Sequence, residues 1–304
     1  MSAAGLVFSA TALPMMVYFG QRTNDVTGVT ITVGIYNLLM ILGYWYIFRI
    51  TAGNDPYDEA GAASAEDLNS PSIWEILVFS LKNPPLWGLM LAEVFRNSYV
   101  LILTAFAYYY FKYVLDEFTL LTVFILAISI ARLSGTLVSS WVGNKIGKRT
   151  TYWLSLVLAA AGFGQSFFFS DNVWSFTAIF CVASMLGVIA GSLSTVLFSD
   201  SVVYGEWKTG RNNRAFIMSL QSLTIKLAIF IRAGVLTLGL SAVGFEANAV
   251  PREGVVEGIR YIMIFAPAAA CAISALVFFL GYRIDEEKVL RMQDEIEARK
   301  PAKV

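Results

Sequence analysis

The chain has 304 residues, of which 57% are hydrophobic and 14% are charged, and its mean hydropathy is +0.64. Soluble domains carry about 25% charged residues, so this composition predicts a polytopic membrane protein. Basic and acidic residues balance at 22 each, which removes the case for a nucleic-acid partner. The chain contains no His, and both Cys lie in apolar stretches, so we expect no His-based catalysis, no metal site and no redox pair.

Eight apolar segments approach or exceed the 20 or so helical residues that cross a bilayer. They are residues 5–20, 28–50, 87–111, 118–142, 151–169, 174–198, 217–244 and 259–282. The first segment could instead be a signal peptide, but it lacks a basic leader and a clear cleavage site, so a membrane span is favoured. The sequence therefore predicts an all-α fold with about eight transmembrane helices.

The connecting segments predict orientation and two further helices. Most Lys and Arg residues fall on the side of the 51–86 loop and the C-terminal tail, which the positive-inside rule makes cytoplasmic. Both termini are then expected in the cytoplasm, with the chain in the cell (inner or plasma) membrane. Residues 72–81 predict a helix on the membrane surface after an acidic linker, and residues 285–300 predict a solvated helix.

Ionisable residues inside the spans are candidate functional groups, because each is costly in hydrocarbon. Glu93, Arg96 and Asn97 fall at i, i+3 and i+4 and therefore share one helix face. This arrangement fits a structural ion pair and fits the wall of a polar cavity equally well.

A second set of polar residues lies in the later spans. Lys226 is near the middle of its span, with Gln221 and Ser222 about one turn earlier, so these three predict a solute or ion pathway. Arg232 falls on a different side of the same helix. Arg132 is expected to face the helix bundle in a structural role.

Residues 143–150, GNKIGKRT, resemble the cytoplasmic loop motif of the major facilitator superfamily. Lys145, Lys148 and Arg149 match the basic positions, and Gly147 matches the glycine. Asn144 stands where the motif has an acidic residue, so a charge relay through this loop is not expected. A plain basic turn on the cytoplasmic side is the alternative.

Residues 199–226, SDSVVYGEWKTGRNNRAFIMSLQSLTIK, resemble the glycoside–pentoside–hexuronide:cation symporters of that superfamily. Val203 replaces a second acidic residue that is common in the family, so that carboxylate is missing here. The positions that match are Asp200, Tyr204, Gly205, Glu206, Trp207, Lys208, Thr209, Gly210, Arg211, Ser219, Leu220, Gln221 and Lys226.

The resemblance implies a partial major-facilitator fold, in which the eight spans correspond to helices five to twelve of twelve. Residues 1–50 would be the last two helices of the N-terminal bundle, and 51–86 the cytoplasmic central loop. Residues 87–283 would form the C-terminal six-helix bundle, and 284–304 a cytoplasmic tail. A missing N-terminal segment of about four helices, which carries the family's ion-binding carboxylates, is then an expected partner.

The resemblance further implies a sugar or glycoside:cation symporter that works by alternating access, with Na⁺ or H⁺ as coupling ion, no cofactor and no enzymatic activity. Glu93, Arg96 and Asn97 would join the Lys226 set in the substrate site. The cytoplasmic gate would consist of Asp200, Tyr204, Glu206, Lys208, Arg211, Arg214, Lys145, Lys148 and Arg149. Two alternatives remain: a major-facilitator carrier of a lipid, peptide or drug, and a non-transporting membrane fragment or assembly protein.

Overall fold

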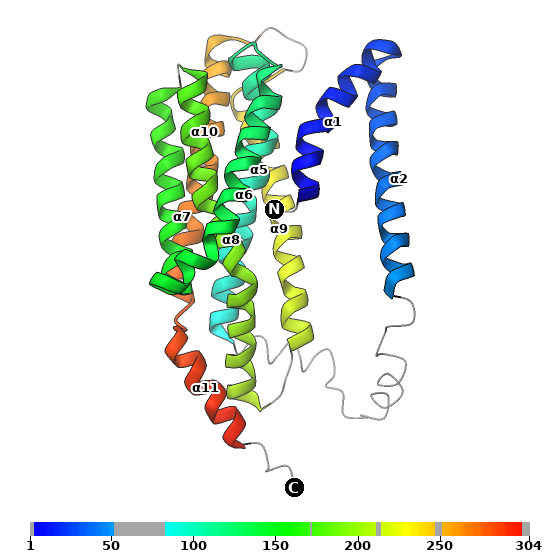
Figure 1. Ribbon diagram of the computed structural model, residues 1–304. Coiled ribbons are helices and arrows are strands. Elements are labelled where there is room, and N and C mark those ends of the chain that lie inside the picture. Colours follow the sequence, from blue (N-terminus) through cyan, green and yellow to red (C-terminus); the bar gives the residue numbers. More distant parts are fainter. Residues whose placement is uncertain (1–2, 52–82, 171, 211–213, 247–250, 300–304) are drawn as a thin grey trace. The chain divides into compact units, whose positions relative to one another are not determined.

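The structure is a computed structural model that describes residues 3–51, 83–170, 172–210, 214–246 and 251–299 (Figure 1). These residues form helices and contain no strand. The chain divides into two compact units, Ala3–Glu75 and Ile76–Val304. The helices are α1 (Ala3–Arg22), α2 (Asp25–Thr51), α5 (Pro84–Tyr109), α6 (Leu120–Ile146), α7 (Lys148–Gln165), α8 (Val173–Thr209), α9 (Arg214–Ala242), α10 (Glu253–Gly281) and α11 (Glu286–Arg299).

The all-α membrane fold predicted from the apolar segments is confirmed. Each of the eight predicted spans lies largely within one helix or its short π or 3-10 extension. Among the residues that the structure describes fully, seven helices, from α2 to α10, are long and apolar enough to cross a membrane. The tail helix predicted over 285–300 is present as α11, whereas the predicted surface helix at 72–81 lies outside the described residues.

The smaller unit contains a hairpin of α1 and α2. The two helices come together at glycines, since a Cβ placed on Gly28 would lie 2.5 Å from the backbone nitrogen of Gly20. A hydrogen bond joins the hydroxyls of Thr11 and Tyr36 across the hairpin. Asn24 begins α2 by accepting a 2.8 Å hydrogen bond from the backbone nitrogen of Thr27, as expected of a helix N-cap.

In the larger unit, α5 lies between α10 and α9, and α8 packs against α6 and α7 (Figure 1). The backbones of α5 and α10 approach closely, because a Cβ on Gly88 would lie only 2.6 Å from the carbonyl carbon of Gly281. Small residues allow this kind of contact between membrane helices. An aromatic core fills the space near the other end of α5, where Tyr110 stacks on Phe176 at 4.8 Å between ring centroids.

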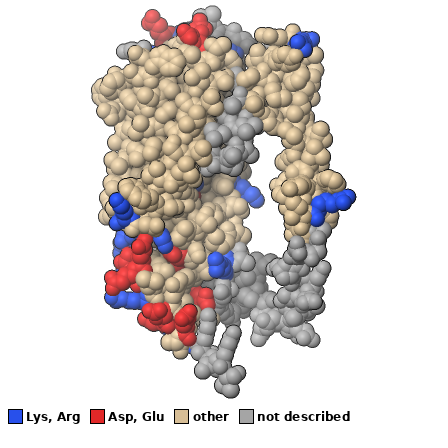
Figure 2. All heavy atoms as spheres, in the orientation of Figure 1, with Lys and Arg blue, Asp and Glu red and all other residues tan. Residues whose placement is uncertain are grey.

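Charged side chains gather around α11 and the adjoining end of α8, whereas the middle of the larger unit is largely uncharged in this view (Figure 2). A 1.5 Å rise per residue makes the 37-residue α8 about 55 Å long, which exceeds the hydrocarbon thickness of about 30 Å. The polar end of α8, which carries the YGEWKTG string, therefore extends beyond the bilayer core. It packs against α11 outside the membrane.

Candidate functional site

An ion pair on α5 lies at the centre of the polar network. Arg96 donates from Nε to Glu93 Oε1 at 2.8 Å and from Nη2 to Glu93 Oε2 at 2.9 Å. Tyr152 on α7 donates its hydroxyl to Glu93 Oε1 at 2.7 Å. The side chain of Glu93 is 1% exposed and that of Arg96 is 11% exposed. The Glu93 carboxylate is thus buried and hydrogen-bonded inside the bundle, whereas part of the Arg96 side chain is exposed.

Arg96 lies on the wall of a cavity of about 440 Å³ between α5, α6, α8 and α9. This volume falls within the range of about 300–1,000 Å³ that small-molecule sites occupy. Apolar residues and Gly191 form part of the lining, and Glu93 is not among the lining residues. The polar and charged side chains of the lining are those of Arg96, Asn97, Arg132, Thr136, Ser192 and Thr195.

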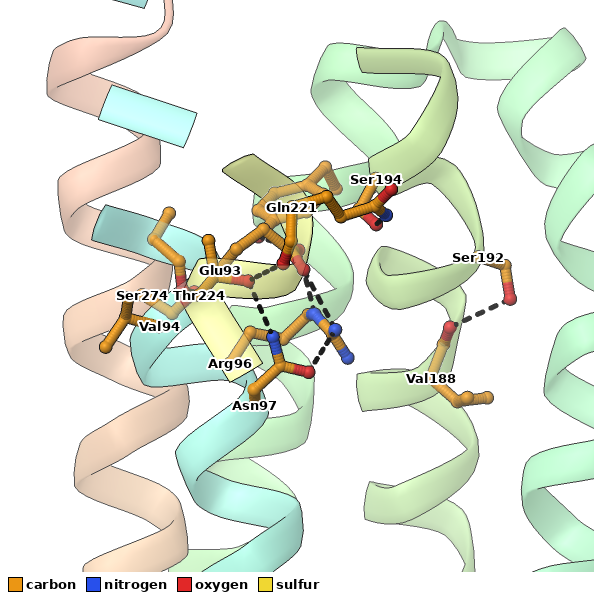
Figure 3. Close-up of polar contacts among 12 residues, drawn as sticks. Glu93, Val94, Arg96, Asn97, Val188, Ser192, Ser194, Gln221, Thr224 and Ser274 are labelled. Carbon is orange, nitrogen blue, oxygen red and sulfur yellow. Dashed lines mark hydrogen bonds and ion pairs between the residues drawn. The ribbon is translucent and has the colours of Figure 1, made fainter. Parts of the chain in front are cut away.

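Two glycines of α8 make room for side chains from α5. A Cβ on Gly191 would lie 2.5 Å from Arg96 Nη1, and a Cβ on Gly187 would lie 2.5 Å from the Tyr99 hydroxyl. The Gly187-x-x-x-Gly191 spacing is common where membrane helices pack closely. Here the two glycines leave room for the Arg96 guanidinium and the Tyr99 phenol, and not for the backbone of a neighbouring helix. Figure 3 shows Arg96 extending from α5 toward α8, with Glu93 and Asn97 beside it.

Hydrogen bonds connect α9 to this network. Asn97 accepts from Arg96 Nη2 at 2.7 Å and donates to the Thr224 hydroxyl at 3.3 Å. Gln221 Nε2 lies 3.2 Å from Ser194 Oγ and 3.1 Å from Thr195 Oγ1, both on α8. The Thr224 hydroxyl donates to the Gln221 carbonyl at 2.7 Å, so Gln221 joins the network through Thr224 (Figure 3).

The other two predicted residues of α9 lie apart from this network. Ser222 is exposed and bonds the carbonyl of Ser219 in its own helix at 2.8 Å. Lys226 is exposed, forms no hydrogen bond or ion pair with any described residue, and does not line the cavity. The structure thus gathers Glu93, Arg96, Asn97 and Gln221, and their roles as substrate-binding residues stay a prediction.

The end of α8 that carries the predicted gate residues Asp200, Tyr204, Glu206 and Lys208 packs against α11. Trp207 Nε1 donates to Glu295 at 2.7 Å, and Arg299 donates to the Trp207 carbonyl at 2.8 Å. Lys208 lies 5.7 Å from the ring centre of Tyr204. Asp200 and Glu206 are partly buried on the same helix.

The first residue of α7 also contacts α11. The backbone nitrogen of Lys148 donates to Glu286 at 3.0 Å, and Lys145 lies 4.0 Å from the ring centre of Trp141. Asp285 begins α11 by accepting a 3.0 Å hydrogen bond from the backbone nitrogen of Lys288, which lowers the pKa of the Asp285 carboxyl. Arg149 is partly buried and Arg214 is exposed, whereas Arg211 lies outside the described residues. The gating role of all these residues stays a prediction.

The sequence analysis did not identify the hydroxyls of the cavity, and it expected Arg132 to face the helix bundle in a structural role; the structure places Arg132 on the cavity wall. Thr136, Ser192 and Thr195 occur at ordinary helical positions with no local signal. Arg132 did carry a signal, because a cation in mid-span with no acidic neighbour on its own helix is costly. Tyr152 could not have been paired with Glu93, since 59 residues separate them in the chain.

The fold and the polar cavity define a polytopic, all-α membrane protein of the transporter type. A family model described as "MFS/sugar transport protein" matches residues 2–286. The chain belongs to this family, and the resemblance to glycoside–pentoside–hexuronide:cation symporters is confirmed.

Several curated proteins are similar to the chain. It is 27% identical over 219 residues to a putative sulfoquinovose importer of Escherichia coli (strain K12), a match that covers 72% of this chain and 47% of the relative. It is 26% identical over 314 residues to an isoprimeverose transporter of Lactiplantibacillus pentosus, covering 97% and 61%. It is 25% identical over 274 residues to a glucuronide carrier protein homologue of E. coli, covering 86% and 59%. The chain thus spans about half to three fifths of the length of these relatives.

Proposed function

We propose that the chain forms the solute-binding C-terminal bundle and cytoplasmic gate of a sugar or glycoside:cation symporter. The family assignment supports this proposal, as do relatives whose names specify sulfoquinovose, isoprimeverose and glucuronide. The observation that carries it is the cavity among α5, α6, α8 and α9, which places two guanidiniums, an amide and three hydroxyls inside a membrane bundle. Polar groups at this depth are costly unless they face water or a polar solute.

The proposed mechanism is alternating access. Residues 87–283 would move against the helices of the other bundle, of which residues 1–50 supply two, and the cavity would open to each side in turn. The contacts of α11 with α8 and with the first residue of α7 would help to close the cytoplasmic side. The basic loops support a cell-membrane location with both termini cytoplasmic.

The coupling ion is proposed to be Na⁺ or H⁺, bound outside the network described above. Both oxygens of Glu93 already accept hydrogen bonds from Arg96, and Oε1 also accepts from Tyr152. A carboxylate paired in this way is a poor ligand for a further cation. Among the described residues, no three or more His, Cys, Asp or Glu are grouped in a way that could hold a metal ion.

The experiment is a binding assay with the purified 304-residue chain in lipid nanodiscs. Isothermal titration with a panel of sugars, a dipeptide and a lysolipid should show binding of sugars only. Thr195→Val removes a cavity hydroxyl and should weaken sugar binding several-fold. The matched control, Thr104→Val, removes an exposed hydroxyl that bonds only its own helix and should leave binding unchanged. Binding of the peptide or lysolipid instead would favour the other carrier class.

A further inference from the structure

The cavity lies near the middle of the membrane. Arg96 is about halfway along α5 (Pro84–Tyr109), and Arg132 is about halfway along α6 (Leu120–Ile146). Both helices are long enough to span the hydrocarbon core. Lipid headgroups lie outside the hydrocarbon core, so a charged ligand at this depth would be a solute that enters the cavity and not a headgroup. This depth is where transporters bind their substrates.

The lining of the cavity includes one positive charge, that of Arg132, for which the described residues supply no counter-ion; Arg96, the other basic residue, is paired with Glu93. The lining contains the guanidiniums of Arg96 and Arg132 and no carboxylate. Arg132 Nε is buried with no hydrogen-bond partner, and Arg132 forms no ion pair with any residue that the structure describes. A buried donor without an acceptor is costly, and the cost is larger for a charged group. Arg132 is otherwise partly exposed and lines the cavity, so an anion inside the cavity would supply the missing partner.

Arg96 also keeps one donor for such a partner. Its Nε and Nη2 bond to Glu93, and Nη2 also bonds to Asn97. Its Nη1 has no hydrogen-bond acceptor in the described part of the chain, and it lies beside Gly191, where no side chain intervenes. Guanidinium groups bind planar or tetrahedral oxyanions through pairs of parallel hydrogen bonds.

The neutral polar groups of the lining suit the rest of a sugar. The hydroxyls of Thr136 and Ser192 donate to backbone carbonyls of their own helices, at 3.0 Å and 3.1 Å. Their oxygens can therefore still accept from a sugar hydroxyl. The Thr195 oxygen accepts from Gln221, which leaves its proton to donate. A ligand that satisfies the whole lining is thus polyhydroxylated and carries one anionic group.

We propose that Arg132, together with Nη1 of Arg96, binds the carboxylate or sulfonate of an acidic sugar. This inference rests on the proposed function and adds to it the charge of the substrate. Glu93 acts behind the site as a positioning residue, because it fixes two of the three nitrogens of Arg96 and leaves the third facing the cavity.

The test measures binding of three sugars of similar size to the nanodisc-embedded chain: glucose, glucuronate and 6-deoxy-6-sulfoglucose. The wild-type chain should bind at least one acidic sugar tenfold or more tightly than glucose. Arg132→Gln should reduce this preference to less than twofold. Arg132→Lys should retain part of the preference for acidic sugars, because the positive charge remains but the paired, planar N–H donors of the guanidinium are lost. The matched control is Arg232→Gln, which removes a guanidinium from α9 outside the cavity lining and should retain the full preference.

The outcomes separate this inference from the proposed function. Glucose binding equal to or tighter than that of both acidic sugars would overturn the anionic-sugar inference and leave the sugar-transport proposal standing. An unchanged preference in Arg132→Gln would overturn the role of Arg132. Competition by inorganic sulfate as effective as that by the sulfonated sugar would reassign the site to simple anions. A folded chain that binds none of the three sugars would contradict both proposals.

Discussion

Substitution of Glu93 by Gln tests whether the α5 ion pair stabilises the bundle. The change removes the negative charge from a side chain that is 1% exposed and leaves Arg96, 11% exposed, without its counter-ion. Loss of one partner from a buried pair costs about 3–5 kcal/mol. Because Arg96 borders a cavity that solvent can enter and still bonds Asn97, we expect the lower end, about 3 kcal/mol.

The assay is thermal unfolding followed by a thiol-reactive fluorophore. Cys271 is fully buried and Cys181 is partly exposed, so a Cys181→Ala background gives a signal that rises when α10 becomes exposed. A loss of 3 kcal/mol lowers the Tm of a 150–250-residue unit by about 6–12 °C. The matched control is Glu257→Gln, which removes an exposed carboxylate from α10 and should leave the Tm within about 2 °C.

A double variant distinguishes pairing from packing. Glu93→Gln combined with Arg96→Gln removes both charges, so it should be less destabilised than Glu93→Gln alone, since no unpaired charge remains. A Tm for Glu93→Gln equal to that of the Glu257→Gln control would refute the reasoning. A double variant less stable than the single variant would show that the two side chains act by packing and not by charge.

Three further predictions concern packing, the tail helix and topology. Gly88→Ala should lower the Tm, because its Cβ would meet the backbone of Gly281. The control Gly234→Ala, where nothing lies within 4 Å of the added Cβ, should leave the Tm unchanged or raise it. Equal shifts in Tm for the two variants would contradict the close approach of α5 and α10. Trp207→Phe removes the 2.7 Å hydrogen bond to Glu295 and should speed tryptic cleavage within α11; an unchanged rate would show that this bond does not hold the helix. An accessibility tag at the C-terminus should report the cytoplasm, and an external report would overturn the orientation.

The sequence predicts the helices of this protein well because its signals are local. An apolar segment of bilayer length must form a helix in hydrocarbon, where every backbone polar group needs an internal partner. The alternation of charge over 285–300 likewise predicts α11, since its ends and faces are set by nearby residues. The helix over Lys148–Gln165 begins directly after Gly147, its N-cap residue.

The candidate site was only partly predictable, since it depends on distant contacts. The i, i+3, i+4 spacing placed Glu93, Arg96 and Asn97 together correctly, and Arg96 does bond both of the others. The spacing could not decide between an ion pair and a cavity wall. The structure shows that both descriptions hold, because Glu93 lies in the interior and the other two line the cavity.

Lys226 and Arg132 show why mid-span charge alone does not locate a site. Both are basic residues near the centres of apolar helices, and the cost of placing either in lipid is similar, about 2.5–3.5 kcal/mol on insertion scales. The two residues differ in how their helices are rotated relative to neighbouring helices, and a single sequence does not determine that rotation. In the structure the neighbour Ile225 lines the cavity and Lys226 does not, whereas Arg132 faces it with a buried, unpaired nitrogen. Helix packing, and not position within the span, therefore decides which of these mid-span charges faces the cavity.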